Sequence, residues 1–309
     1  MGLVVETKNL SKFYNGFKAV ENLNLRINEG EIYGFLGSNG AGKTTTTLML
    51  LGLTEPTSGE AWVKGYNSTK EPQRVKRITA YLPENVGFYE DLSARRNLRY
   101  IARLNGIPDR DSESKIDEVL ELVGLKDVVD WEVRKFSKGM KQRLGMATVL
   151  VKEPVLAILD EPTAGIDPEG AHQILDLIVK MSRERRMTVL LASHLLYQVR
   201  QICDRVGIIS HGRLVAEGTI DKLGAEVLGG RTILHVQVSR LSDTLVDSLK
   251  RIKGVSEVEV LGNLLRIGSD RDVRGAVCET VMKSGSTLLE LRSQEYSLEE
   301  IYLRYFHGE

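Results

Sequence analysis

The most constraining feature of this sequence is a glycine-rich octapeptide that matches GxxxxGKT, the phosphate-binding loop: Gly37-Ser38-Asn39-Gly40-Ala41-Gly42-Lys43-Thr44. Its glycines let successive backbone N–H groups converge on an anion without a Cβ in the way. Lys43 reaches the β- and γ-phosphates of a nucleotide, and Thr44 offers its hydroxyl to Mg²⁺. The loop therefore predicts a nucleotide site, and by itself it does not name the reaction.

The residues on either side of the loop fit a strand and a helix. Residues 31–36 form a short apolar run suited to a buried strand, and residues 45–53 suit a helix that begins at about Lys43. Such a helix points its positive N-terminal end at bound phosphates, and Thr45 lies in its first turn. Strand, loop and helix in this order make a chance glycine-rich turn a poor explanation.

Length and charge limit the remaining possibilities. At 309 residues the chain is long enough for about two domains. Its 42 acidic and 42 basic residues balance, so no net field draws it to nucleic acid and we expect no nucleic-acid partner. The apolar runs end well short of the roughly 18 residues of a spanning helix, and the first residues lack a signal-peptide layout. We therefore expect a cytoplasmic protein.

An aromatic residue precedes the phosphate loop. Residues 3–10 and 23–28 alternate apolar and polar side chains, as half-buried strands do. Between them we expect a loop that carries Tyr14. An aromatic side chain at that place either stacks on a purine base or caps the sheet as a half-buried loop residue, and position alone does not separate the two.

Glu84 is predicted to lie beside the nucleotide. The chain is apolar from residue 78 to residue 82, and Pro83 should end this strand. Glu84 then opens a loop at the C-terminal end of the strand. In open α/β sheets, ligands bind at that end of the strands.

Residues 92–151 are predicted to be mainly helical. Apolar side chains between residues 116 and 123 recur at the spacing of one helix face, and Gly124 supplies a stop. Four arginines between residues 95 and 103 form a basic cluster. The cluster is either solvated helix surface or, together with the loop of Glu84, a docking surface for a partner.

A second candidate anion site stands at the start of a later helix. Residues 136–143 contain Ser137 and Gly139, where free backbone N–H groups of the first helical turn can bind an anion. The alternative is an ordinary N-cap at Ser137. Taken alone, the segment favours the N-cap.

Two carboxylates follow a strand that is predicted to be buried on both faces. Residues 155–159 are a continuous apolar run, typical of a central parallel strand, and Asp160-Glu161 come next. Buried carboxylates are costly unless they hold a cation or transfer protons. We predict that Asp160 binds Mg²⁺ and that Glu161 orients or deprotonates an attacking water. The alternative is a structural cap for the next loop.

Asp167 and His194 complete the candidate residues. Asp167-Pro168 has the pattern of an N-cap followed by a first-turn proline. His194 follows a predicted buried strand at residues 187–192. A histidine at that position is, by itself, more often structural than functional.

These motifs together resemble the nucleotide-binding subunit of an ABC transporter over about residues 3–218. They occur in the family's order and spacing: the phosphate loop, Phe136-Ser137-Lys138-Gly139-Met140, Leu159-Asp160-Glu161-Pro162, Ala164-Gly165-Ile166-Asp167 and Ala192-Ser193-His194. The resemblance implies an α/β fold, the P-loop NTPase core of ABC-type ATPases, with a helical subdomain at about residues 85–151.

The resemblance also implies ATP and Mg²⁺ as ligands and gives each candidate a role. Tyr14 would stack on adenine, and residues 37–45 would bind the phosphates. Thr44, Asp160 and Glu84 would hold the metal, and Lys43, Glu84, Glu161 and His194 would act in hydrolysis, with His194 on the γ-phosphate. Ser137 and Gly139 would bind ATP on a facing subunit of a head-to-tail dimer, formed with a second copy or a paralogue, and Asp167 would line the seam.

Two departures from the family pattern stand out. Glu84 replaces the family's usual glutamine, and Lys138 and Met140 interrupt its LSGGQ signature, although Ser137 and the second glycine remain. A YLPE loop with SKGMKQR is similar to the subgroup that serves type-2 exporters, including daunorubicin-resistance and sodium-extrusion systems.

Residues 219–309 lie beyond the resemblance and predict a second domain. We expect a strand at 231–240, a helix at 242–252, a hairpin of 255–261 with 264–268, a helix at 270–284 and a strand at 286–292. A capping box at residues 297–300 predicts a last helix. The order βαββαβ indicates a small α+β, ferredoxin-like accessory domain.

The function expected from the resemblance is ATP hydrolysis that drives export through a separate transmembrane permease, with the chain peripheral on the cytoplasmic face of the membrane. An importer ATPase is one alternative. Another is a soluble ABC-type ATPase that acts as a binding switch on ribosomes or other complexes, but those proteins resemble two fused cassettes, whereas this chain has one phosphate loop. A chromosome-maintenance ATPase would need long heptad repeats between the motifs, which the sequence lacks.

Overall fold

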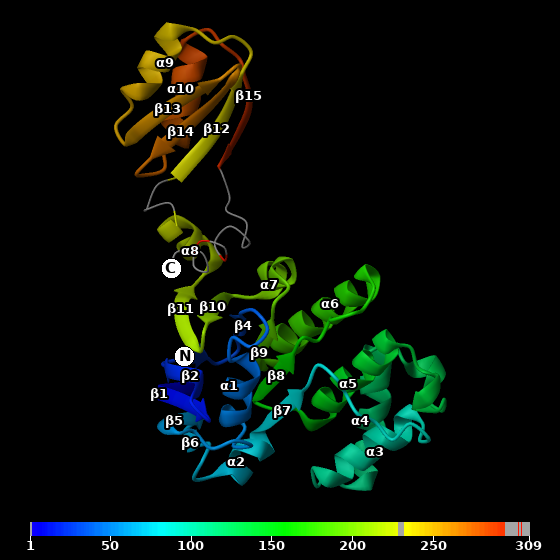
Figure 1. Ribbon diagram of the computed structural model, residues 1–309. Coiled ribbons are helices and arrows are strands. Elements are labelled where there is room, and N and C mark those ends of the chain that lie inside the picture. Colours follow the sequence, from blue (N-terminus) through cyan, green and yellow to red (C-terminus); the bar gives the residue numbers. More distant parts are fainter. Residues whose placement is uncertain (1, 228–231, 294–301, 303, 305–309) are drawn as a thin grey trace. The chain divides into compact units, whose positions relative to one another are not determined.

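The structure is a computed structural model that describes residues 2–227 and 232–293, together with residues 302 and 304. The chain divides into two compact units, Met1–Gly218 and Thr219–Glu309 (Figure 1). The capping box at residues 297–300, which predicts a last helix, lies outside the described residues.

A six-stranded sheet forms the centre of the first unit. In space the strands lie in the order β11-β10-β4-β9-β8-β7, and every neighbouring pair is parallel except β10 with β11. The inner strands β4, β8 and β9 are buried on both faces, as their continuous apolar runs predict. The strands are β4 (Ile32–Leu36), β7 (Thr79–Leu82), β8 (Leu156–Asp160), β9 (Thr188–Ser193), β10 (Arg205–Ser210) and β11 (Arg213–Gly218).

An antiparallel sheet from the N-terminal part of the chain covers one side of this unit. Its order is β2-β1-β5-β6, with β3 paired to β1. The strands are β1 (Leu3–Tyr14), β2 (Phe17–Leu23), β3 (Arg26–Asn28), β5 (Ser58–Val63) and β6 (Tyr66–Asn67). The prediction of one strand at 23–28 was wrong, because the strand begins at Phe17 and is interrupted after Leu23, before β3.

Seven α-helices of the first unit connect and cover these strands. They are α1 (Lys43–Leu50), α2 (Pro72–Ile78), α3 (Ala94–Leu104), α4 (Asp109–Leu122), α5 (Lys138–Lys152), α6 (Pro168–Arg185) and α7 (Leu196–Ile202). The helix after the phosphate loop ends at Leu50 and not at residue 53, and α2 was not predicted.

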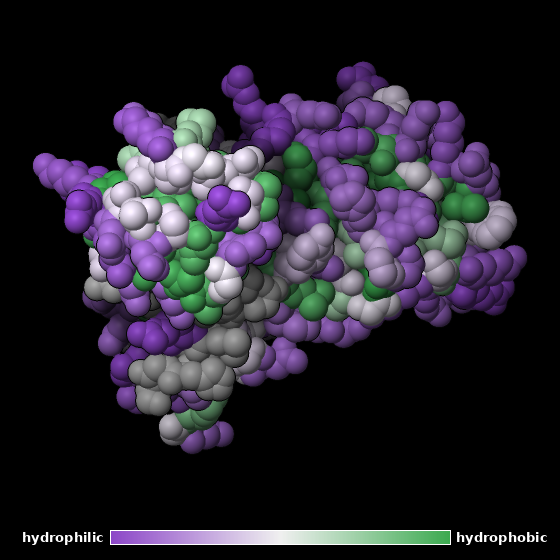
Figure 2. Space-filling model, turned by 90° about the horizontal axis from the view of Figure 1, so that it is seen from above, coloured by the Kyte–Doolittle hydropathy of each residue, from purple (hydrophilic) through white to green (hydrophobic). Residues whose placement is uncertain are grey.

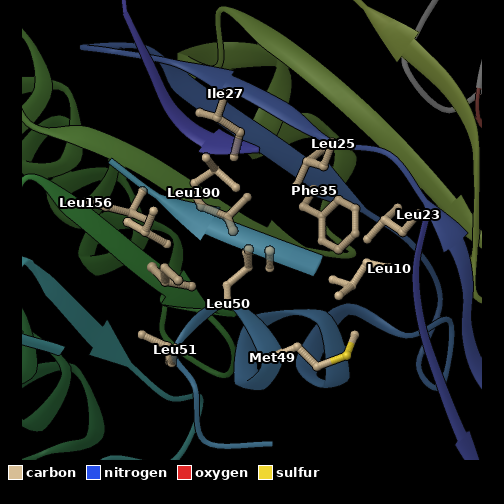
Figure 3. Close-up of a cluster of buried hydrophobic side chains, with 14 of the residues drawn as sticks. Leu10, Leu23, Leu25, Ile27, Phe35, Met49, Leu50, Leu51, Leu156 and Leu190 are labelled. Carbon is tan, nitrogen blue, oxygen red and sulfur yellow. The ribbon is translucent and has the colours of Figure 1, made fainter. Parts of the chain in front are cut away.

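The core of the first unit joins both sheets to α1. Leu10 and Leu23 of the antiparallel sheet pack in one buried cluster with Phe35 of β4 and with Met49 and Leu50 of α1 (Figure 3). Each of these side chains is almost completely removed from water, and burial of such a side chain is worth about 1.5–3 kcal/mol. The cluster therefore fixes the end of β4 and the start of α1, between which the phosphate loop runs.

The helical segment contains α3, α4 and α5, with two short 3₁₀ helices, η1 (Lys126–Val128) and η2 (Val133–Lys135). Three of the four arginines on α3 pair with acidic residues of α4 or its start: Arg95 with Asp117 at 2.6 Å, Arg99 with Glu113 at 2.6 Å and Arg103 with Asp109 at 2.7 Å. These pairs make the basic cluster part of a surface charge network between two helices. They do not support it as the docking surface.

The second unit begins with α8 (Ile220–Val227) and continues as an α+β sandwich. Its elements are β12 (Thr232–Val238), α9 (Asp243–Lys250), β13 (Val255–Leu261), β14 (Leu264–Ser269), α10 (Arg274–Lys283) and β15 (Leu288–Ser293). The sheet order is β13-β14-β12-β15, and its apolar face packs on α9 and α10 through Leu234, Val236, Leu245 and Val277. The observed order is therefore βαββαβ.

None of the described helices is long and apolar enough to span a bilayer. The face of the molecule in Figure 2 carries mostly hydrophilic side chains, with smaller apolar areas between them.

Candidate functional site

The phosphate loop runs from the end of β4 to the start of α1, and its backbone needs glycine. Gly40 and Gly42 have φ values of +82° and +111°, in the left-handed region. A Cβ on Gly42 would also come within 2.5 Å of the carbonyl oxygen of Ala19. A ligand can therefore approach the loop backbone closely, and the loop packs at Gly42 directly against the antiparallel sheet.

Lys43 is held across this loop. Its side chain is 6% exposed, and its Nζ donates to the carbonyl oxygens of Gly37 at 2.6 Å and Ser38 at 3.2 Å. Burial lowers the pKa of Lys43, and the nearby carboxylates of Glu161, Asp160 and Glu84 oppose that shift. The result is an ammonium group fixed at the centre of the loop with three carboxylates around it.

Asp160 lies at the C-terminal end of β8 and is 6% exposed. Its Oδ2 accepts hydrogen bonds from the hydroxyls of Thr44 at 3.2 Å and Tyr81 at 3.4 Å. Burial raises the pKa of Asp160, although the bond from Thr44 opposes the shift. Burial and the Asp160 charge also raise the pKa of Tyr81 to about 12, which keeps its phenol protonated.

Glu161 follows in a strained conformation, with φ of +49° for a residue that carries a Cβ. Its Oε2 accepts from the hydroxyl of Ser193 at 3.1 Å, and its Oε1 lies 2.7 Å from Nδ1 of His194 and 3.9 Å from Nζ of Lys43. An ionised carboxylate can only accept, so Nδ1 carries the proton of His194 in this arrangement. Both oxygens of Glu161 therefore have a partner in the same chain, and each can still accept a further hydrogen bond.

One cavity of about 280 Å³ brings most of the predicted residues together. Its lining is Tyr14, Phe17, Ala19, Ser38, Asn39, Gly40, Gly42, Lys43, Thr44, Thr45, Glu84, Asp160 and Glu161. Gly37, Ala41 and His194 are not in this lining, but Gly37 accepts from Lys43 and His194 contacts Glu161, both of which are. Ser137, Gly139 and Asp167 are absent from the lining of this cavity.

These last three residues belong to two neighbouring segments outside the cavity. Ser137 caps α5 by accepting from the backbone N–H of Met140 at 3.2 Å, and Asp167 caps α6 by accepting from Gly170 at 2.9 Å. A Cβ built on Gly139 would lie 3.6 Å from Ile166, so the start of α5 packs on the residues that precede α6. The N-cap expected at each position is present.

Several cavity or contact residues were not predicted from the sequence, and Ala19 is one that lines the cavity. Phe17 lines the cavity, Tyr81 bonds Asp160, and Ser193 bonds Glu161. A signal for Phe17 was available, because Asn15-Gly16 is a strong two-residue hairpin sequence and would have placed Phe17 opposite Tyr14. Ser193 had a signal too, because it ends a continuous apolar run, whereas no comparable signal marked Tyr81.

The chain is similar in sequence to a known protein family and to several of its members. A family model described as ABC transporter matches residues 20–164. The chain is 38% identical over 309 residues to a bacitracin transport ATP-binding protein of Bacillus licheniformis, covering 100% of this chain and 99% of that protein. It is 36% identical to the daunorubicin/doxorubicin resistance ATP-binding protein of Streptomyces peucetius, covering 97% and 91%.

A solved structure agrees with the fold. The ATP-binding subunit of an ABC transporter superimposes with a TM-score of 0.67 and 32% sequence identity, over 73% of this chain and 93% of that one. The predicted α/β fold of ABC-type ATPases and the resemblance to that family are both confirmed.

Proposed function

The chain belongs to the family of ATP-binding subunits of ABC transporters, and we propose that it drives export of a substrate through a separate transmembrane subunit. As a member of this family it is an ATPase. The observation that carries the proposal is a single cavity that holds the phosphate loop and two buried carboxylates. Relatives named for bacitracin transport and for daunorubicin/doxorubicin resistance support export as the direction.

The residues around Asp160 fit a bound Mg²⁺. Thr44 and Asp160 place two oxygen atoms 3.2 Å apart, and Glu84 lines the same cavity with a further carboxylate. Oxygen ligands of this kind are those that Mg²⁺ prefers, and a cation would offset the cost of burying Asp160. When bound, Mg²⁺ would neutralise charge on the β- and γ-phosphates.

The proposed roles of the other cavity residues follow from their geometry. Residues 37–45 bind the phosphates through backbone N–H groups, and Lys43 supplies a positive charge that is already in place. Tyr14 stacks on the base. Glu161 accepts a proton from the attacking water, as a carboxylate general base.

His194 controls whether Glu161 is available. In the observed arrangement Oε1 of Glu161 is bonded to Nδ1 of His194, and this bond competes with a water molecule for that oxygen. His194 is 46% exposed on its side chain and has room to move. We therefore propose that His194 turns to the γ-phosphate when ATP binds, which frees Glu161 for the water.

A second copy of the chain, or a paralogue, would complete the site. The start of α5 bears Ser137, Gly139 and free backbone N–H groups, and it contributes nothing to the cavity of its own chain. A helix N-terminus of this kind suits the γ-phosphate of ATP held by a facing subunit. The proposed assembly is a head-to-tail dimer with Asp167 at its seam.

A second cavity supports docking of the transmembrane subunit. It measures about 270 Å³ and lies between the end of α1, β7, α3 and α5, with Leu53, Ile101, Asn105, Thr148 and Lys152 among its lining. Leu53 is 53% exposed there, an apolar contact that a partner helix would cover. We propose that this cavity receives a segment of the permease, which would place the chain on the cytoplasmic face of the membrane.

The decisive experiment measures hydrolysis with and without a membrane partner. The purified chain should release phosphate from ATP in the presence of Mg²⁺, and reconstitution with its transmembrane subunit in lipid should change that rate. Leu53→Glu should abolish the change caused by the partner while leaving the rate of the isolated chain unaltered. Co-sedimentation with ribosomes in place of membranes would contradict the transport proposal.

A further inference from the structure

The hairpin that carries Tyr14 also carries a second exposed aromatic ring. Strands β1 and β2 are joined by Asn15 and Gly16, whose φ values of +43° and +85° are those of a type I′ turn. In this turn Tyr14 and Phe17 are directly paired across the hairpin. Paired residues of antiparallel strands point to the same face, with Cβ atoms about 4.5–5.5 Å apart.

Both rings open onto the nucleotide cavity. Tyr14 and Phe17 line it together with the phosphate loop, and they are 45% and 63% exposed. The amine of Lys12 lies 5.0 Å from the centre of the Tyr14 ring and covers part of it. Phe17 has a larger exposed fraction and is wholly apolar, so water is a poor environment for it.

The position of Phe17 relative to the loop is fixed by the backbone. Phe17 and Ala19 are two residues apart on β2, and both line the cavity. The carbonyl oxygen of Ala19 lies so close to Gly42 that any side chain there would collide with it. The backbone that carries Phe17 is therefore held beside the phosphate loop by a direct contact between β2 and the loop.

We propose that Phe17 is a second base-contacting residue, so that the base of the bound nucleotide lies against the rings of both Tyr14 and Phe17. This inference rests on the proposed nucleotide site and adds a residue that determines its base specificity. A phenylalanine ring offers no hydrogen bond, so it selects for the size and apolar face of the base. It should favour purine over pyrimidine triphosphates, because a purine presents the larger stacking surface.

Phe13 provides a matched control on the same hairpin. It is also an exposed phenylalanine, at 38%, but it is paired with Lys18 and does not line the cavity. Its ring lies 6.0 Å from the amine of Lys18. Removing this ring tests the general effect of losing an aromatic side chain from β1 without touching the proposed base contact.

The experiment measures equilibrium affinities of the full-length chain for ATP, CTP and inorganic tripolyphosphate. Phe17→Ala should weaken ATP binding by about fivefold to fiftyfold, the range expected for one base–ring stack, and CTP binding by less. Tripolyphosphate binding should stay within about twofold, because that ligand has no base. Phe17→Trp should restore ATP affinity, and Phe13→Ala should match the unchanged chain.

The outcomes separate this inference from the function that it builds on. If the unchanged chain binds ATP and Phe17→Ala binds it equally well, the base contact is wrong and the nucleotide site stands. If Phe17→Ala weakens ATP and tripolyphosphate by the same factor, the ring acts on the loop and not on the base, which also overturns the inference. If the unchanged chain binds none of the three ligands, the nucleotide site itself is wrong.

Discussion

Replacing Glu161 by glutamine separates its structural role from its chemical one. The carboxylate is bonded to Ser193 at 3.1 Å and to His194 at 2.7 Å. The amide of Glu161→Gln has the same shape: its oxygen can accept from Ser193, and its NH₂ can donate to Nδ1 in the other tautomer of His194. We therefore expect the fold and the ATP affinity to survive, while the proton acceptor is lost.

The size of the effect follows from that difference. Loss of a positioned general base costs about 10²- to 10⁴-fold in rate, or about 2.7–5.4 kcal/mol of the barrier. A rearranged hydrogen bond costs only about 0.5–1.5 kcal/mol of stability. Hydrolysis by Glu161→Gln should thus fall by at least about a hundredfold, whereas the melting temperature should change by only a few degrees.

Two assays on the same protein test this reasoning. Phosphate release measures the rate, and size-exclusion chromatography with Mg²⁺ and either ATP or ADP measures assembly. Because ATP persists in the variant, ATP should shift it from monomer to dimer and ADP should not. Glu279→Gln, on the exposed face of α10 in the second unit, makes the same chemical change at a carboxylate that pairs with Lys283, and it should behave like the unchanged chain. If Glu161→Gln hydrolysed ATP within about threefold of the unchanged rate, Glu161 would not be the general base. If the variant stayed a monomer with both nucleotides, the proposed homodimer would be wrong.

Three further changes test the rest of the site. Tyr14→Ala should weaken binding of a fluorescent ATP analogue by about tenfold to a hundredfold and Tyr14→Trp should not; equal affinities would remove Tyr14 from the site. Glu84→Gln should keep Mg²⁺-dependent phosphate release within about tenfold, because an oxygen remains, and Glu84→Ala should lose up to about a hundredfold; an unchanged rate in Glu84→Ala would exclude a metal contact. Burial raises the pKa of Asp160 in the folded protein. The fold is therefore more stable while this carboxyl is protonated, and that stabilisation is lost as the pH rises through the raised pKa. Asp160→Asn should therefore raise the melting temperature of the metal-free protein by about 2 to 4 °C near neutral pH and by less in acid, and scanning fluorimetry showing equal shifts at both pH values would contradict this.

The sequence predicted many residues of this cavity because the patterns that carry them are local. The phosphate loop depends on glycines that are adjacent in the chain, and β8 and β9 are continuous apolar runs whose ends carry Asp160 and Ser193. Parallel strands end at the same edge of a sheet, so the side chains that follow them had to meet.

The parts that sequence reasoning missed depend on contacts between distant segments. Tyr81 bonds Asp160 because β7 and β8 are neighbours in register, with Tyr81 paired to Ile158, and no local pattern states which strand adjoins which. The hairpin at Asn15-Gly16 is different, because Asn-Gly is a local turn signal from which the hairpin could have been predicted. The alternation of apolar and polar side chains over residues 23–28 predicted a strand in the wrong place. The true strand, β2, is bulged against β1 and has an irregular burial pattern.

The departure at Lys138 involves a contact with Gly165, a residue that matches the family pattern. Lys138 stands where the family signature has glycine, and its side chain lies over Gly165 in the segment that precedes Asp167. A Cβ on Gly165 would come within 2.4 Å of the Lys138 amine, and the φ of +68° at this position would strain any residue that has one. A side chain at residue 165 would therefore require the flexible end of Lys138 to move, in addition to the strained backbone. Glycine at 165 makes a lysine at 138 compatible with the same packing of α5 against the α6 cap, so the added charge at the signature need not displace Ser137 or Gly139 from the helix start on which the proposed dimer contact depends.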